Sequence, residues 1–152
     1  MSDSYKAYLA FLERLGDQID ELTDVEKAKT AAVRRDDLMA VNECMRQEQA
    51  ISLTLRSMDH ERETMLKDLG MEGVSLSGLP ERYPPEIRPE ARGAAERLRA
   101  KYDIYRSAAD VARMTLEINL HEIEKIMEQR GLTGENLPVS RLPGGSFTDI
   151  RA

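Results

Sequence analysis

Few side chains in this sequence have the types and spacing that metal binding or catalysis requires. Glu117 and His121 are four residues apart, so on a helix they would lie one turn from each other and offer a metal ion two ligands. A metal site inside a helical bundle needs several carboxylates that point inward. Both residues fall outside the apolar face of their expected helix, so we expect an exposed pair, with no metal and no cofactor.

Other catalytic patterns are absent from the sequence. It contains no glycine-rich phosphate loop, no Ser/His/Asp signature and no His-Glu-x-x-His zinc motif. Cys44 is the only cysteine, which excludes an intramolecular disulfide and a Cys-based zinc site and is typical of cytoplasmic proteins. We interpret Cys44 as a small buried hydrophobic side chain. These observations predict a protein that is not an enzyme.

Apolar residues spaced alternately three and four apart occur in three segments, and this spacing is typical of helices that pack along a seam. The first seam is formed by Tyr5, Tyr8, Leu12, Leu15, Ile19 and Leu22, followed by a phase slip to Val25, Ala28 and Ala32. The second is formed by Val41, Cys44, Glu48, Ile51, Leu55, Met58, Arg62, Met65 and Leu69. The third is formed by Ala91, Ala95, Leu98, Tyr102, Tyr105, Ala109, Ala112, Leu116, Asn119, Ile123 and Ile126. The seams predict an all-α fold, an elongated antiparallel bundle of long coiled-coil-like helices.

Capping signals and breakers set the expected boundaries. We expect helices at residues 3–34, 37–69 and 86–130, which form one domain at 1–130, with a loop at 71–85 that has room for a helical turn at Leu76–Leu79. Thr23–Glu26 matches a capping box, so the first helix either continues past Leu22 or kinks there. Residues 131–152 have no apolar period and several Gly and Pro, which predicts a mobile tail.

Three polar side chains interrupt the seams. Glu48 and Arg62 are too far apart on one helix to pair, so each either extends to the edge of the bundle or meets a charge on another helix. Asn119 either fixes the register between helices or lies at a solvated margin.

Composition narrows the partners and the compartment. The net charge is -6, the isoelectric point is about 5.1 and the mean hydropathy is -0.53. An acidic chain is a poor ligand for nucleic acid or anionic lipid, so proteins are the expected partners. No apolar run is long enough for a bilayer, and the first residues lack the pattern of a secretory signal, so we expect a cytoplasmic protein.

A second apolar stripe on the last helix has the most functional content. Ile104, Val111, Met114 and Ile118 follow one another at spacings of seven, three and four residues, away from the third seam. We call these four residues the outer stripe. Large aliphatic groups on an outer face indicate a further contact, with a partner, with a second copy of the chain, or with the loop or tail of the same chain. We take the outer stripe as the candidate partner-binding site.

The expected helices and several segments within, between and after them resemble those of one protein family. The segments are the Asp-Asp-Leu sequence at Asp36–Leu38, the segment Arg62-Glu63-x-x-Leu66-x-x-Leu69-Gly70, the stretch SLSGLPERYP and the end GGSFTDIRA. In this order they resemble the FlgN family of flagellar export chaperones over nearly the whole chain. Many members carry paired Asn residues midway along the last helix, and this chain does not.

The resemblance implies a function and partners. It implies a cytoplasmic chaperone that binds the C-terminal helical segments of hook-associated proteins, which form the hook-filament junction. The chaperone would prevent their premature assembly and aid their delivery to the flagellar type III export machinery. The main alternative is a structural coiled-coil protein that forms homodimers through the outer stripe, and a more distant one is a metal-dependent bundle enzyme.

Overall fold

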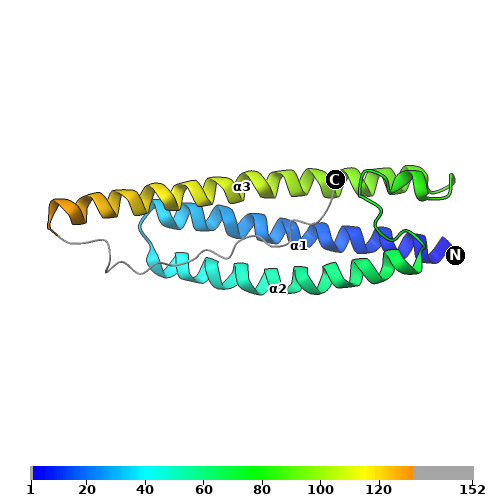
Figure 1. Ribbon diagram of the computed structural model, residues 1–152, viewed down its shortest axis with the longest axis horizontal. Helices are drawn as coiled ribbons and strands as arrows, with labels where there is room; N and C mark the ends of the chain where they lie inside the picture. The colour runs from blue at the N-terminus through cyan, green and yellow to red at the C-terminus, as the bar shows by residue number, and fades with distance from the viewer. Residues whose placement is uncertain (1, 132–152) are drawn as a thin grey trace.

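The computed structural model describes residues 2–131, which form three long helices joined by one tight turn and one loop (Figure 1). The helices are α1 (Ser2–Arg34), α2 (Leu38–Asp68) and α3 (Arg88–Gln129), with a 3₁₀ helix η1 (Pro80–Arg82) between α2 and α3. No strand occurs among these residues, and the all-α bundle predicted from the seams is confirmed. The tail expected from residue 131 onward lies, except for Gly131, outside the described residues.

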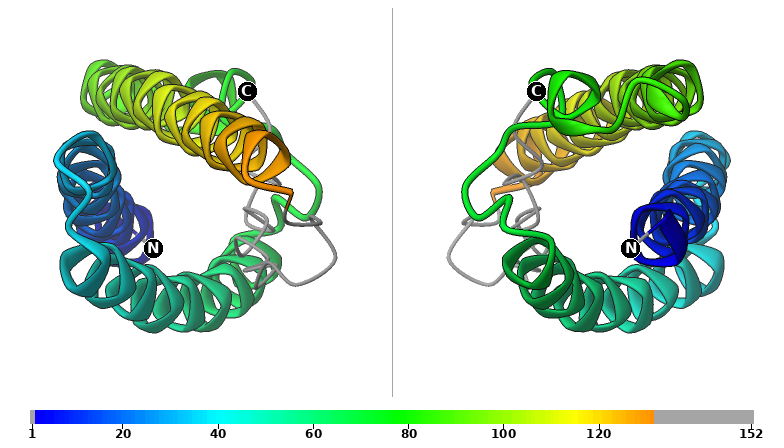
Figure 2. Two further views of the ribbon diagram at one scale, coloured as in Figure 1. Left: turned by 90° about the vertical axis from the view of Figure 1, so that its left-hand side faces the viewer. Right: turned by 90° about the vertical axis from the view of Figure 1, so that its right-hand side faces the viewer.

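The middle position in the bundle belongs to α1. It packs against both α2 and α3, whereas no Cα atom of α2 lies within 8 Å of one in α3. Seen end on, the three helices therefore follow an arc with α1 at its centre (Figure 2). Because α1 has two neighbours, it must bury a wider face than a two-helix seam requires.

Ion pairs and hydrogen bonds between helices show the directions and the register. Arg97 of α3 bonds to Glu13 of α1 across a sequence separation of 84, and Asn119 bonds to Asp36 across a separation of 83. A nearly constant separation means that α1 and α3 run parallel. The chain reverses between α1 and α2 and again before α3, so α2 is antiparallel to both (Figure 1).

The first seam continues through charged residues, alongside most of the predicted phase slip. From Leu22 onward the alternate spacing of four and three leads to Glu26, Lys29 and Val33, all of which are buried. Of the residues that the slip placed in the seam, Val25 and Ala32 are buried too, and Ala28 is exposed. The sequence interpretation followed apolar residues and so missed a seam that buries charges.

Of the two alternatives for the first helix, continuation past Leu22 is the one observed, since α1 is unbroken from Ser2 to Arg34. The Thr23 hydroxyl donates to the carbonyl oxygen of Ile19, one turn back, at 2.8 Å. It therefore bonds within the helix as interior threonines do and caps no new helix.

Both ends of α2 are defined by local hydrogen bonds. Asp36 has φ +55° and allows the chain to turn, and the Asp37 carboxylate then accepts from the Ala40 N–H to cap α2. At the other end Gly70 has φ +68°, and the Met71 N–H donates to the Leu66 carbonyl as in a Schellman motif. The predicted connection at residues 36–37 and the stop at Gly70 thus have a structural basis.

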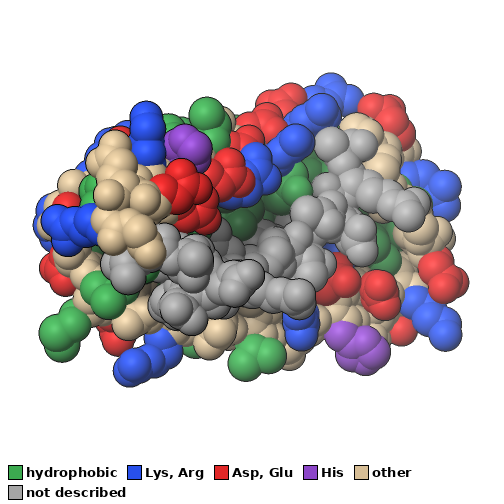
Figure 3. Space-filling model, turned by 60° about the vertical axis from the view of Figure 1, so that its left-hand side comes forward, with side chains coloured by type: hydrophobic (Ala, Val, Ile, Leu, Met, Phe, Trp, Pro, Cys, Tyr) green, Lys and Arg blue, Asp and Glu red, His purple; other side chains and the backbone are tan. Residues whose placement is uncertain are grey.

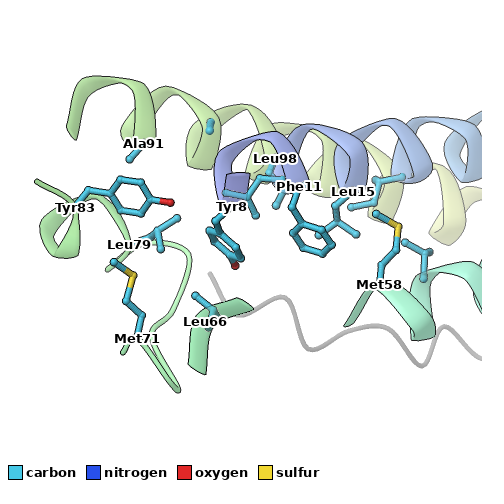
Figure 4. Packing of buried hydrophobic residues seen from close by; sticks show 14 of the residues in the cluster. Tyr8, Phe11, Leu15, Met58, Leu66, Met71, Leu79, Tyr83, Ala91 and Leu98 are labelled. Carbon is cyan, nitrogen blue, oxygen red and sulfur yellow. The ribbon is translucent and has the colours of Figure 1, made fainter. Parts of the chain in front are cut away.

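The loop after α2 closes one end of the bundle with buried side chains (Figure 4). Met71, Leu79 and Tyr83 belong to the main core cluster, and the Tyr83 hydroxyl donates to the Tyr5 carbonyl oxygen at 2.9 Å. At the turn expected at Leu76–Leu79 the Leu79 N–H donates to the Leu76 carbonyl oxygen at 3.4 Å, and the 3₁₀ helix η1 follows directly. Pro80 begins it, because proline suits the first turn of a helix.

The last part of α3 extends beyond α1 and α2. Since α1 ends at Arg34 and Asn119 lies beside Asp36, the residues after Asn119 have no neighbouring helix among the described residues. Ile123 and Ile126, expected in the third seam, are therefore exposed. The seam itself is buried or half-buried as far as Asn119.

Candidate partner-binding surface

All four residues of the outer stripe are exposed on α3. The exposed fraction is 55% for Ile104, 45% for Val111, 55% for Met114 and 59% for Ile118. No described part of the loop between α2 and α3 covers them, which removes one of the intramolecular explanations. A row of large aliphatic groups in water is typical of an interaction surface.

A groove runs beside the first half of this stripe, between α1 and α3. Its volume is about 600 Å³ and it is lined by Lys27, Thr30, Ala31, Arg34, Asp103, Ile104, Ser107, Ala108 and Val111. The floor is made of small side chains, so another helix could approach the backbone closely there. Ile104 and Val111 of the outer stripe therefore belong to one wall of an open groove.

The groove has a closed end and an open end. At the closed end Lys101 of α3 reaches across to α1, where its Nζ lies 2.9 Å from an Asp20 carboxylate oxygen and 3.7 Å from one of Asp17. Gly16 leaves room for this side chain, because a Cβ there would lie 3.1 Å from the Lys101 Cδ. At the other end α1 stops at Arg34, and the surface continues along α3 alone.

Further exposed apolar residues gather at the open end. Leu120, Ile123 and Ile126 project from the free end of α3, and Leu38 and Met39 from the beginning of α2. Figure 3 shows hydrophobic side chains standing out among charged ones at this end of the molecule. Together with Val111, Met114 and Ile118 they make it the most apolar part of the described surface.

A buried charge cluster lies between α1 and α2, on the core side of the groove. Lys29 Nζ is 2.8 Å from both carboxylate oxygens of Glu48 and 3.2 Å from one of Glu26. These three side chains are only 4–7% exposed. Of the alternatives for Glu48, the charge on another helix is the one observed.

The protonation state of Glu26 sets the net charge of this cluster. Burial raises the pKa of Glu26 from its ordinary 4.5 to about 8, and a hydrogen bond to Glu48 adds to this effect. Near neutral pH a protonated Glu26 donates to the Glu48 carboxylate, which also accepts from Lys29. The cluster then holds one positive and one negative charge, and each polar group in it has a partner.

The other seam interruptions have local partners. Arg62 bonds to Asp59 on its own helix at 3.0 Å and is half-buried. Asn119 donates to Asp36 at 3.3 Å from a half-exposed position, so it combines a contact between elements with a solvated margin.

The pair considered for metal binding is fully on the surface. Glu117 and His121 are exposed, and Glu117 lies 4.0 Å from Arg113. Across residues 2–131 no three His, Cys, Asp or Glu side chains come together as metal ligands would.

Comparisons with known proteins identify no relative. No family model, curated protein or solved structure matches this chain. Of the helices at residues 2–131, none has the length and apolarity needed to cross a bilayer.

Sequence reasoning missed the other wall of the groove. Lys27 and Arg34 are seven residues apart on α1, and Asp103 and Asp110 are seven apart on α3. This heptad spacing of exposed charges was the available signal. It could be used only once the parallel register placed the two rows on either side of one groove.

Proposed function

We propose that this protein is a chaperone of the FlgN type, which binds a helical segment of a hook-associated protein along α3 and keeps it from assembling before export. The observation that carries the proposal is the exposed outer stripe beside an open groove, on a helix whose opposite face is already buried in the bundle. A helix laid in such a groove is held by its own residues at helical spacing.

The identity of the client comes from the sequence resemblance alone. Under this proposal the protein works in the cytoplasm, holds hook-associated proteins and passes them to the export machinery. Chaperone activity of this kind needs a stable bundle and an accessible apolar surface, and no catalytic group.

The test is binding of a C-terminal segment of a hook-filament junction protein, measured by calorimetry. The variant Val111→Asp/Ile118→Asp should keep its helical circular dichroism, because both side chains are already about half exposed. Its affinity should fall at least tenfold, since that corresponds to only about 1.4 kcal/mol and burying one large aliphatic group contributes about 1.5–3 kcal/mol.

A matched control separates binding from folding. Leu98 is 2% exposed on the seam of the same helix, so Leu98→Asp should unfold the protein. A Val111→Asp/Ile118→Asp variant that unfolds in the same way would show that the outer stripe is core. Undiminished binding by a folded double variant would place the client elsewhere.

Self-association is the second candidate, favoured by the exposed apolar groups at the free end of α3. Light scattering distinguishes the two. A dimer that is abolished by the double variant and is unaffected by the junction segment would support the structural coiled coil.

A further inference from the structure

The charges on both sides of the groove are segregated by helix. On the α1 side Lys27 and Arg34 line the groove, seven residues apart. On the α3 side an exposed row with the same spacing is formed by Asp103, Asp110 and Glu117. Each of them directly precedes a residue of the outer stripe. We call these three residues the acidic row.

The acidic row remains available to a partner. Arg113, behind it on α3, lies 3.3 Å from Asp110 and 4.0 Å from Glu117. The side chains in these pairs are 59–68% exposed, so the pairs are screened by water and can be exchanged at little cost. Within the described part of the chain, neither Lys27 nor Arg34 forms an ion pair.

This pattern argues against an antiparallel second copy of the chain as the occupant. In a two-fold pair of antiparallel α3 helices, each flank faces the same flank of the other helix. The acidic row would then face itself. Like charges placed opposite one another weaken such an antiparallel pair, whereas a helix with one basic and one acidic flank would meet opposite charges on both sides of the groove.

We propose that the groove receives an amphipathic helix whose apolar seam has Lys or Arg along one flank and Asp or Glu along the other. The basic flank lies against the acidic row of α3, and the acidic flank lies against Lys27 and Arg34 of α1. From Asp103 to Ile118 the surface covers sixteen residues of α3, about 22 Å at ~1.5 Å per step from one residue to the next, which matches about four turns of the bound helix. This inference rests on the proposed function and specifies the chemistry of its ligand.

The experiment uses two synthetic peptides of 21 residues, about five to six turns, with one composition and the same leucine seam. In the segregated peptide all Lys lie on one flank and all Glu on the other. In the interspersed peptide Lys and Glu alternate on both flanks. The two have the same net charge, so general attraction to the acidic protein is the same for both. Reversing a docked helix exchanges its flanks, and the interspersed peptide cannot match the groove in either direction.

We expect the full-length protein to bind the segregated peptide about tenfold more tightly than the interspersed one. Each exposed ion pair contributes little to the binding free energy, and several together account for this difference. The variant Asp103→Lys/Asp110→Lys/Glu117→Lys should lose the preference. Its control, Glu63→Lys/Glu72→Lys/Glu86→Lys, changes the net charge equally at exposed positions away from the groove and should keep it.

The outcomes distinguish this inference from the proposed function. Equal binding of both peptides, or a preference that survives reversal of the acidic row, overturns the charge assignment and leaves helix binding intact. Failure to bind either peptide overturns this inference, whereas the proposed function is decided by binding of the junction-protein segment. A wild-type dimer that dissociates on Val111→Asp/Ile118→Asp substitution would make a second copy the occupant and also overturn the inference.

Discussion

Replacing Lys29 with Met tests the contribution of the buried charge cluster to stability. Lys29 Nζ is 2.8 Å from both Glu48 oxygens, and its side chain is 4% exposed. Without the ammonium group, the Glu48 carboxylate remains in a site that water hardly reaches. Removing one partner of a buried pair costs about 3–5 kcal/mol. Because a folded domain is stabilised by only about 5–15 kcal/mol, the variant should lose a large part of its free energy of unfolding.

Urea unfolding followed by circular dichroism measures this loss. The matched control is Lys29→Met/Glu48→Leu, which removes both charges and should recover most of the stability. A single variant within about 1 kcal/mol of the wild type would refute the reasoning, because that loss is ordinary for a substitution without a buried charge. Equal losses in the single and double variants would refute it as well.

Three further predictions follow from local geometry. The pKa of Glu26 is about 8 in the folded protein, against an ordinary value of 4.5. The stability that comes from binding this proton in the folded state is therefore complete below about pH 4.5 and is lost as the pH rises through about 8. Urea unfolding across this range should show the decline, and Glu26→Gln should flatten it. Gly70→Ala should cost about 1 kcal/mol in unfolding free energy, because φ is +68° there, whereas Gly93→Ala inside α3 should stabilise by about 0.5–1 kcal/mol. Tyr83→Phe should cost about 0.5–1.5 kcal/mol in thermal or urea unfolding, because it removes the bond from the buried hydroxyl to the Tyr5 carbonyl oxygen, and an unchanged stability would mean that this bond contributes nothing.

The helices were predictable because their signals are local. Alternating spacings of three and four, Asp37 as a cap and Gly70 as a stop act within a few residues of the chain. The exposed outer stripe was also predictable, because its residues lie away from a seam on the same helix. The loop was less predictable, since η1 and the buried Tyr83 depend on packing against α1.

The errors came from the position of α1 between two other helices. Phe11 is fully buried beside Leu12, although only Leu12 lies in the predicted seam. Adjacent buried residues are needed where one helix packs on two neighbours. The sequence does indicate such a wide buried face, because apolar residues stand side by side at Phe11–Leu12 and at Ala32–Val33. The buried charges gave no such signal, because a single charged side chain has the same sequence appearance whether it is solvated or paired.

The sequence by itself determined the number of long helices, the turns between them and the presence of a second apolar stripe on the last one. These features depend on the backbone preferences and periodicity of neighbouring residues. The tertiary structure alone decided that α1 and α3 run parallel, that Glu26, Lys29 and Glu48 meet in the interior, and that Lys27 and Arg34 face Asp103 across a groove. Those juxtapositions join residues far apart in the chain. They depend on the register of packed helices, which is fixed by the sum of many contacts and by no short motif.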